Sequence, residues 1–163
     1  MPKAEEGISL IGGIGNPIRY KWLSDLQNRG YYFERLIHKN TCIGDNVIIG
    51  MGSVICPNVT LTNDVVLGDH CIVNVNSSIS HDCVIGDCVT ISPGASIGGK
   101  VHIGNHSWIG IGSTIIQNVK IGARVFIAAG AVVVNDIPDD SLVVGVPGKV
   151  IRILDSDSWK NII

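Results

Sequence analysis

His81 has the surroundings that best suit a general base in this 163-residue chain. Histidine has an unperturbed pKa near neutrality, so its imidazole can take a proton from an attacking amine or hydroxyl. Asp82 follows directly and is placed to orient or charge that ring. Eighteen positions after His81 lies Gly99, in a Gly98-Gly99 pair whose backbone N–H groups are open to a carbonyl oxygen. A thioester bound there would meet a base and an oxyanion donor side by side, provided that the fold stacks Gly99 against His81.

A six-residue repeat supplies that stacking. In steps of six from Ile43 to Val133, all sixteen positions are Ile, Leu or Val. The residue three places after each aliphatic is usually Gly, Asn or Asp, which tolerate a left-handed backbone and so mark a tight corner. Three hexads, each with one short strand and one corner, close a triangular coil of 18 residues, and parallel pairing stacks the coils about 4.8 Å apart. The pattern predicts an all-β solenoid, a parallel β-helix of about five coils.

The other histidines occupy less suggestive places in this pattern. His38 precedes the repeat, His70 and His106 fall at corners, and His102 lies on an apolar outer face. We expect His102 and His106 to be structural or interface residues. The alternative for His81 is a solvated corner residue, and the glycine pair one coil further on favours the functional interpretation.

The sequence divides into three expected parts. Residues 1–40 form the βαβ remnant of an α/β domain, residues 41–137 the β-helix, and residues 138–163 a C-terminal strand and tail. The elements expected in the outer parts are a strand at Ile8–Ile11, a helix from Pro17 to Arg29, a strand at Tyr32–Ile37 and a short helix around Ser156–Ile162.

Taking every eighteenth residue sorts the outward side chains of the repeat by face. The first face carries Ile48, Val66, Val84, His102 and Lys120, the second Val54, Ile72, Thr90, Trp108 and Phe126, and the third Thr60, Ser78, Ser96, Thr114 and Val132. Two faces therefore expose apolar side chains, and contiguous apolar surface marks an interface. Because heterologous contacts must close into a ring to avoid filaments, the sequence predicts a homotrimer.

Composition excludes several classes of partner. The net charge of −2 and the lack of a basic stripe argue against nucleic acid. No stretch approaches the roughly 18 apolar residues of a membrane span, and the first residues lack the plan of a signal peptide, so we expect no membrane partner and a cytoplasmic protein. The five cysteines are an odd number without a CxxC pair, which predicts reduced, buried thiols.

The hexad signature, as in Ile43-Gly44 and Ile85-Gly86, resembles the hexapeptide-repeat family of left-handed parallel β-helices. A more specific likeness runs from Ser80 to Arg152, through His-Asp-Cys-Val-Ile-Gly-Asp, Ile-Ser-Pro-Gly-Ala, Gly-Gly-Lys-Val-His-Ile-Gly, Trp-Ile-Gly-Ile-Gly-Ser and Val-Gly-Val-Pro-Gly-Lys. This stretch is similar to the sugar acyltransferases of the sialic acid O-acetyltransferase type, which include bacterial N-acetyltransferases of 4-amino nucleotide sugars. Ile8–His38 resembles the closing segment of that family's N-terminal domain.

The resemblance implies an acetyl-CoA-dependent acyltransferase that acts on the amine or hydroxyl of a sugar by direct transfer. His81 matches the family's general base and Asp82 its acidic neighbour. The positions that match contacts to acetyl-CoA are Gly99 beside the acetyl group, Ile111, Ala129 and Gly130 along the pantetheine, and Lys149 near the nucleotide. The family further implies acetyl-CoA as co-substrate, no metal, and active sites between the subunits of a homotrimer.

Two departures from the family's pattern concern the acceptor and the acetyl group. Thr90 stands where close relatives have a second histidine. The first half of the N-terminal domain, with its Gly-rich loop for nucleotide-sugar phosphates, has no counterpart in the sequence, and Gly12-Gly13-Ile14-Gly15 fits a turn better than a phosphate loop. The acceptor therefore stays open between an amino sugar, a sialic acid and an unrelated amine.

Two other functions compete with this interpretation. A non-catalytic hexapeptide scaffold would use His81 and Asp82 merely as corner residues. A γ-type carbonic anhydrase would need three convergent imidazoles for zinc. His81, His102 and His106 are available, but the last two are four positions apart, where that family's pair is five apart.

Overall fold

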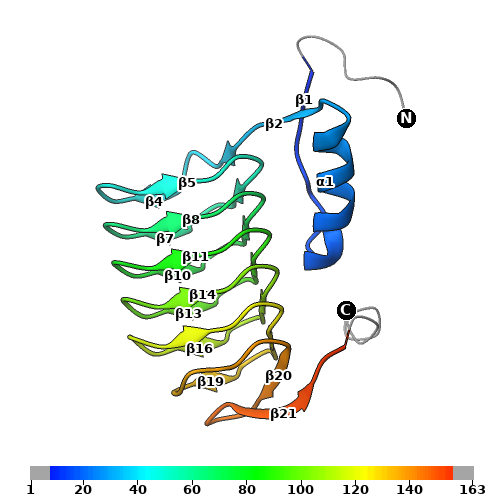
Figure 1. Ribbon diagram of the computed structural model, residues 1–163. Coiled ribbons are helices and arrows are strands. Elements are labelled where there is room, and N and C mark those ends of the chain that lie inside the picture. The colour runs from blue at the N-terminus through cyan, green and yellow to red at the C-terminus, as the bar shows by residue number, and fades with distance from the viewer. Residues whose placement is uncertain (1–7, 156–163) are drawn as a thin grey trace.

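The computed structural model describes residues 8–155 as a left-handed parallel β-helix preceded by a βαβ unit (Figure 1). Parallel partners lie eighteen residues apart, as in Ser78↔Ser96 and Ile79↔Ile97, so three hexads do close one coil. The predicted fold class is confirmed. One face stacks six strands, so the solenoid has about six turns where five were expected.

The strands of the solenoid lie on three faces, each named here by its first strand. The β4 sheet contains β4 (Cys42–Ile43), β7 (Thr60–Leu61), β10 (Ser78–Ile79), β13 (Ser96–Ile97), β16 (Thr114–Ile115) and β19 (Val132–Val133). The β5 sheet contains β5 (Ile48–Ile49), β8 (Val66–Leu67), β11 (Val84–Ile85), β14 (His102–Ile103) and β17 (Lys120–Ile121). The β3 sheet contains β3 (Leu36–Ile37), β6 (Val54–Ile55), β9 (Ile72–Val73), β12 (Thr90–Ile91), β15 (Trp108–Ile109), β18 (Phe126–Ile127), β20 (Ser141–Val144) and β21 (Lys149–Ile153).

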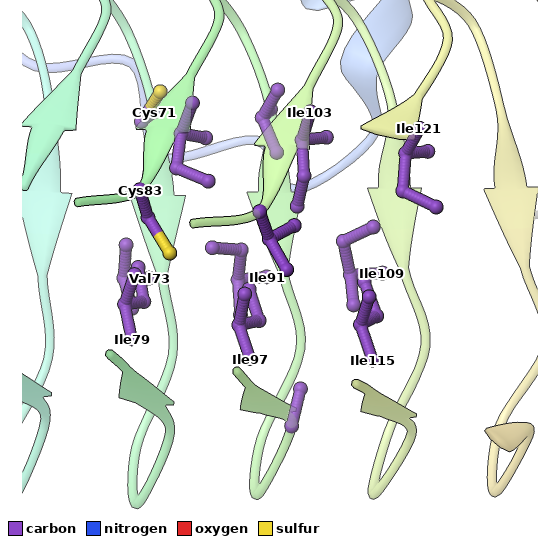
Figure 2. Close-up of a cluster of buried hydrophobic side chains, with 14 of the residues drawn as sticks. Cys71, Val73, Ile79, Cys83, Ile91, Ile97, Ile103, Ile109, Ile115 and Ile121 are labelled. Carbon is purple, nitrogen blue, oxygen red and sulfur yellow. The ribbon is translucent and has the colours of Figure 1, made fainter. Parts of the chain in front are cut away.

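Ladders of identical aliphatic positions fill the interior of the solenoid. Ile79, Ile97 and Ile115 stack in one such ladder, and all three are buried (Figure 2). The small residues of the hexad, such as Cys71 and Cys83, complete the layer between the ladders. Burying one such side chain stabilises the fold by roughly 1.5–3 kcal/mol. The repeat of one aliphatic in every hexad therefore accounts for most of the core.

The corners have the left-handed backbone that the sequence predicts. Asn46 and Asp82 have φ angles of 56° and 59°. Arg124 also has a positive φ of 55° although it is neither Gly, Asn nor Asp, which shows that the coil geometry overrides local preference. Asp136 is an exception among the expected corners. The last coil is two residues shorter than the others. The backbone N–H of Lys120 donates to the side chain of Asp136, sixteen residues later, where equivalent bonds span eighteen.

The N-terminal unit consists of β1 (Ser9–Leu10), the 3-10 helix η1 (Pro17–Arg19), α1 (Tyr20–Asn28) and β2 (Tyr32–Phe33). β1 and β2 pair in parallel, as a βαβ unit requires. The strand expected at Tyr32–Ile37 is split, because β3 pairs with β6 of the solenoid. The solenoid also extends beyond its expected end, since β20 pairs with β18. The helix expected at Ser156–Ile162 lies outside the described residues.

The N-terminal unit packs against the β3 sheet through a buried arginine. Arg19 is 1% exposed, and its guanidinium donates to Gly15 O and Thr90 Oγ1 at 2.7 Å each and to His70 O at 2.8 Å. The interpretation that both apolar outer faces are free is therefore wrong for one of them. Ile72 and Thr90 on the β3 sheet are buried in the single chain, because the N-terminal unit docks there.

None of the helices within residues 8–155 combines the length and apolarity needed to cross a bilayer.

Candidate active site

His81 and Asp82 form the corner between β10 and β11. The left-handed backbone at Asp82 turns its carboxylate toward the imidazole, and His81 Nδ1 lies 2.7 Å from Asp82 Oδ2. Because an ionised carboxylate only accepts hydrogen bonds, Nδ1 carries the hydrogen and Nε2 is left to accept a proton. The side chains are 59% and 48% exposed, so a substrate can reach them.

Gly99 lies directly against the His81 ring, one coil further along. A Cβ atom at Gly99 would be 2.6 Å from His81 Nε2, a distance at which the ring has to move. The N–H of Lys100 donates to His81 O at 2.8 Å and ties the two corners together. Glycine is therefore required at position 99 for the imidazole to keep its place.

The backbone N–H of Gly99 lacks the acceptor that several corners in the same hexad place possess. The N–H groups of Asp45, Asp69 and Asp87 each donate, at 2.8 to 3.0 Å, to an Asp or Asn side chain eighteen residues later. Gly99 has the same place in its hexad, but the residue eighteen positions later is Gln117. Within residues 8–155 no acceptor takes the Gly99 N–H. An unpaired backbone donor beside an imidazole is suited to hold a carbonyl oxygen on which negative charge develops.

The other residues matched to acetyl-CoA contacts lie at a different corner. Ile111, Ala129 and Gly130 are exposed where the β3 sheet turns into the β4 sheet, and Gly130 N–H donates to Ile111 O at 2.8 Å. Lys149 is the exposed first residue of β21. His81 and Gly99 lie at the opposite edge of the β4 sheet. A single chain therefore brings His81, Asp82 and Gly99 together but keeps the predicted pantetheine residues apart from them.

His70 and His106 pack against aromatic rings of the N-terminal unit. Tyr20 stacks on His106 with ring centroids 4.3 Å apart, and Phe33 meets His70 edge-on at 4.7 Å. Burial lowers the pKa of both imidazoles, and the neighbouring carboxylates partly oppose that shift. Among the residues that the structure describes, no three His, Cys, Asp or Glu side chains converge on a metal position.

Thr90 serves the docking of the N-terminal unit. Its hydroxyl accepts from Arg19 Nη1 and donates to Gly15 O, and the residue is 1% exposed. Thr90, which stands where close relatives have a second histidine, therefore bonds to the chain's own N-terminal unit.

Sequence reasoning overlooked the role of Gln117. An Asp or Asn stands in the same hexad place at positions 45, 63, 69, 87 and 105, and Gln117 departs from this series, which indicates that the Gly99 N–H has no short side-chain acceptor. The signal is a residue without a short acceptor side chain, and such a residue does not stand out among residues that themselves carry chemistry.

Known proteins resemble the chain in both sequence and fold. The bacterial transferase hexapeptide family, defined by six repeats, matches residues 64–99 and 100–135. A comparison with curated protein sequences gave no match.

Three solved structures are similar over most of the chain. The acetyltransferase domain of PglB from Neisseria gonorrhoeae is 36% identical with a TM-score of 0.85, and the alignment covers 88% of this chain and 70% of that one. WeeI from Acinetobacter baumannii is 36% identical with a TM-score of 0.87, over 91% and 73% of the two chains. PerB from Caulobacter crescentus, solved with CoA and GDP-perosamine, is 33% identical with a TM-score of 0.85, over 89% and 71%. The chain therefore belongs to the bacterial hexapeptide-repeat acyltransferases, as an acetyltransferase of the group that contains these proteins.

Proposed function

We propose that this protein transfers the acetyl group of acetyl-CoA to the amine of a nucleotide-linked amino sugar. The observation that carries the proposal is the pairing of His81 with the open N–H of Gly99. The acceptor class is supported by PerB, which was solved with CoA and GDP-perosamine and is 33% identical to this chain. A scaffold protein would have no use for an unpaired corner N–H next to an oriented imidazole.

The proposed reaction is direct transfer. His81 Nε2 takes a proton from the acceptor amine as the nitrogen attacks the thioester carbonyl and the C–N bond forms. The N–H of Gly99 holds the oxygen that becomes negative, which in acyl-transfer enzymes contributes on the order of 10²–10³ to kcat. As the tetrahedral intermediate collapses, the C–S bond breaks and the CoA sulfur leaves, taking the proton back from the imidazolium. Asp82 keeps the ring oriented through Nδ1 and stabilises its charged form.

We also propose that the complete site forms between subunits of a homotrimer. His81 and Gly99 lie at one edge of the β4 sheet, and Ile111, Ala129 and Gly130 at the other, so one pantetheine chain cannot follow both edges of the same subunit. A neighbouring subunit that presents its Ile111 edge to the His81 edge would join the two halves. Ile48 and Val84 on the adjacent β5 sheet are 61% and 42% exposed and offer the apolar contact.

The test measures free CoA thiol released from acetyl-CoA in the presence of an acceptor panel. The panel contains GDP-perosamine, other nucleotide-linked 4-amino sugars, sialic acid and simple amines, with a blank that lacks acceptor. We expect turnover with a nucleotide-linked amino sugar and an N-acetylated product by NMR. The proposed acceptor would be contradicted if CoA thiol were released only when a sialic acid is present. It would also be contradicted if acetyl-CoA bound but no acceptor caused release of thiol.

A further inference from the structure

Several corner carbonyls of the solenoid are held from the inside by a small buried side chain. Ser53 donates to Gly68 O at 3.0 Å and Ser107 to Gly122 O at 3.0 Å. Cys71 and Cys83 occupy the same place in their hexads and donate through sulfur to Gly86 O and Gly98 O, each at 3.1 Å. All four donors lie fifteen residues before their acceptors. An inward hydroxyl or thiol thus fixes the carbonyl end of each of these corner peptides.

The same peptides are held at their other end on the outside. In a trans peptide the C=O and the following N–H point in opposite directions, so an inward carbonyl sends the N–H outward. The outward N–H groups of Asp69, Asp87 and Ala123 donate to Asp87, Asn105 and Asp139 at 2.8, 3.0 and 2.9 Å. The Gly98–Gly99 peptide differs from these three. Cys83 holds its carbonyl, while its N–H beside His81 has no acceptor within residues 8–155.

We propose that Cys83 is a positioning residue, whose thiol fixes the plane of the Gly98–Gly99 peptide and thereby aims the Gly99 N–H at the acetyl carbonyl. The inference rests on the proposed function and assigns a role in it to a residue buried in the core. Glycine has the largest backbone freedom, so a Gly-Gly peptide without an anchor can rotate away. Cys83 supplies the sole hydrogen bond to Gly98 O within the described part of the chain.

Two features of Cys83 suit this role. The side chain is fully buried, and burial raises the pKa of the thiol, so its hydrogen stays in place to be donated. A hydrogen bond accepted by a peptide carbonyl also polarises that peptide and strengthens its N–H as a donor. The thiol therefore both orients the N–H and strengthens its contact with developing negative charge.

The experiment compares Cys83→Val with Cys71→Val. Valine is native to the same hexad place at Val65, Val89 and Val101, so both variants are expected to fold. Each removes one buried S–H···O bond of 3.1 Å, but the peptide held by Cys71 has no part in the site and keeps its outer bond to Asn105. We expect Cys83→Val to lower kcat at least about tenfold, a fraction of the loss expected from removing an oxyanion donor outright. KM for acetyl-CoA should change little, and Cys71→Val should keep kcat within about twofold of the wild type.

Cys83→Ser provides the rescue, because serine donates the same bond at positions 53, 77 and 107. We expect it to recover most of the wild-type kcat. If Cys83→Val fails to fold, Cys83→Ala and Cys71→Ala replace the pair. Equal kcat values for the Cys83 and Cys71 variants, with equal losses of Tm, would show a merely structural thiol and overturn the proposed role alone. A wild type that transfers acetyl to none of the acceptors would overturn the proposed function and this role together.

Discussion

The chemistry that we propose for the candidate site depends on which hydrogen bonds single residues leave unmade. His81 keeps Nε2 free because Asp82 takes Nδ1, and Gly99 keeps its N–H free because Gln117 supplies no short acceptor. The positions of His81, Asp82 and Gly99 followed from the eighteen-residue spacing of the sequence. The open N–H did not, since it requires knowing that Asp and Asn side chains of the next coil accept the N–H groups of several other corners, such as Asp69 and Asp87.

Gln117→Asn should occupy the Gly99 N–H with a side-chain acceptor and leave the fold intact. The shorter amide is expected to accept the Gly99 N–H as Asn105 accepts the Asp87 N–H at 3.0 Å. Losing one oxyanion donor costs on the order of 10²–10³ in kcat, so we expect a fall of that size together with an unchanged or higher Tm. Steady-state kinetics and thermal unfolding of the same preparation provide both values.

Gln117→Ala is the control, because it removes the amide without supplying an acceptor. It should keep kcat within a few-fold of the wild type. A fully active Gln117→Asn variant would show that the Gly99 N–H takes no part in the reaction.

At the scale of the elements, the repeat determines the strands and the corners, but the docking of the N-terminal unit is not periodic. The hexad pattern predicted where the strands of the solenoid lie, because one aliphatic in six has to point inward. It did not predict that Thr90 and Ile72, which point outward, would be buried, with Thr90 bonded to Arg19 of η1. That contact depends on Arg19, a residue whose sequence position gives no sign of its burial. The coil count was low because the repeat was counted from Ile43, although Ile37 lies one hexad earlier, and because β20 pairs sixteen rather than eighteen residues after β18.

The docking of α1 is expected to weaken in mild acid. Burial is the main cause that lowers the pKa of His70 and His106 below the ordinary value of 6.5, with Arg19 lowering both further, Arg124 lowering that of His106, and Asp69 and Asp87 acting in the opposite direction. The folded state therefore prefers the neutral imidazoles, and protonation favours the unfolded state. Stability from these groups is fully present above the ordinary pKa and is lost as the pH falls below it.

Denaturant unfolding at pH 8 and pH 5.5 tests this linkage. The wild type should lose stability between the two values. The double variant His70→Asn and His106→Asn, in which asparagine suits the positive φ of both corners, should lose less. Equal losses in both proteins would assign the pH dependence to other groups.

For the whole molecule, the separation of the two predicted half-sites is the reason why we propose that assembly is part of the mechanism. The β4 sheet divides the His81 edge from the Ile111 edge, and α1 lies on the far side of the solenoid from the β4–β5 corners (Figure 1). Sequence reasoning predicted a trimer from two free apolar faces. The β5 sheet still offers such a face, whereas the middle of the β3 sheet is covered by the chain's own N-terminal unit.

Light scattering should give a mass three times the 17.3 kDa of the chain. Val84→Asp puts a charge on the exposed β5 sheet and should lower both that mass and the activity, because a separated subunit has half a site. Ser96→Asp places the same charge on the exposed, more polar β4 sheet and should leave the mass unchanged. A monomeric wild type with full activity would contradict the shared site.

The most direct test of the central claim compares the wild type with His81→Asn in two assays on the same samples, acetyl-CoA binding by calorimetry and acetyl transfer to the preferred amino sugar. Asparagine keeps a polar side chain over Gly99 but cannot act as a base at neutral pH. We expect the Kd for acetyl-CoA to change less than about threefold, while kcat falls by the roughly 10²–10⁴ that general-base catalysis contributes. A His81→Asn variant that binds acetyl-CoA and turns over at the wild-type rate would contradict the account.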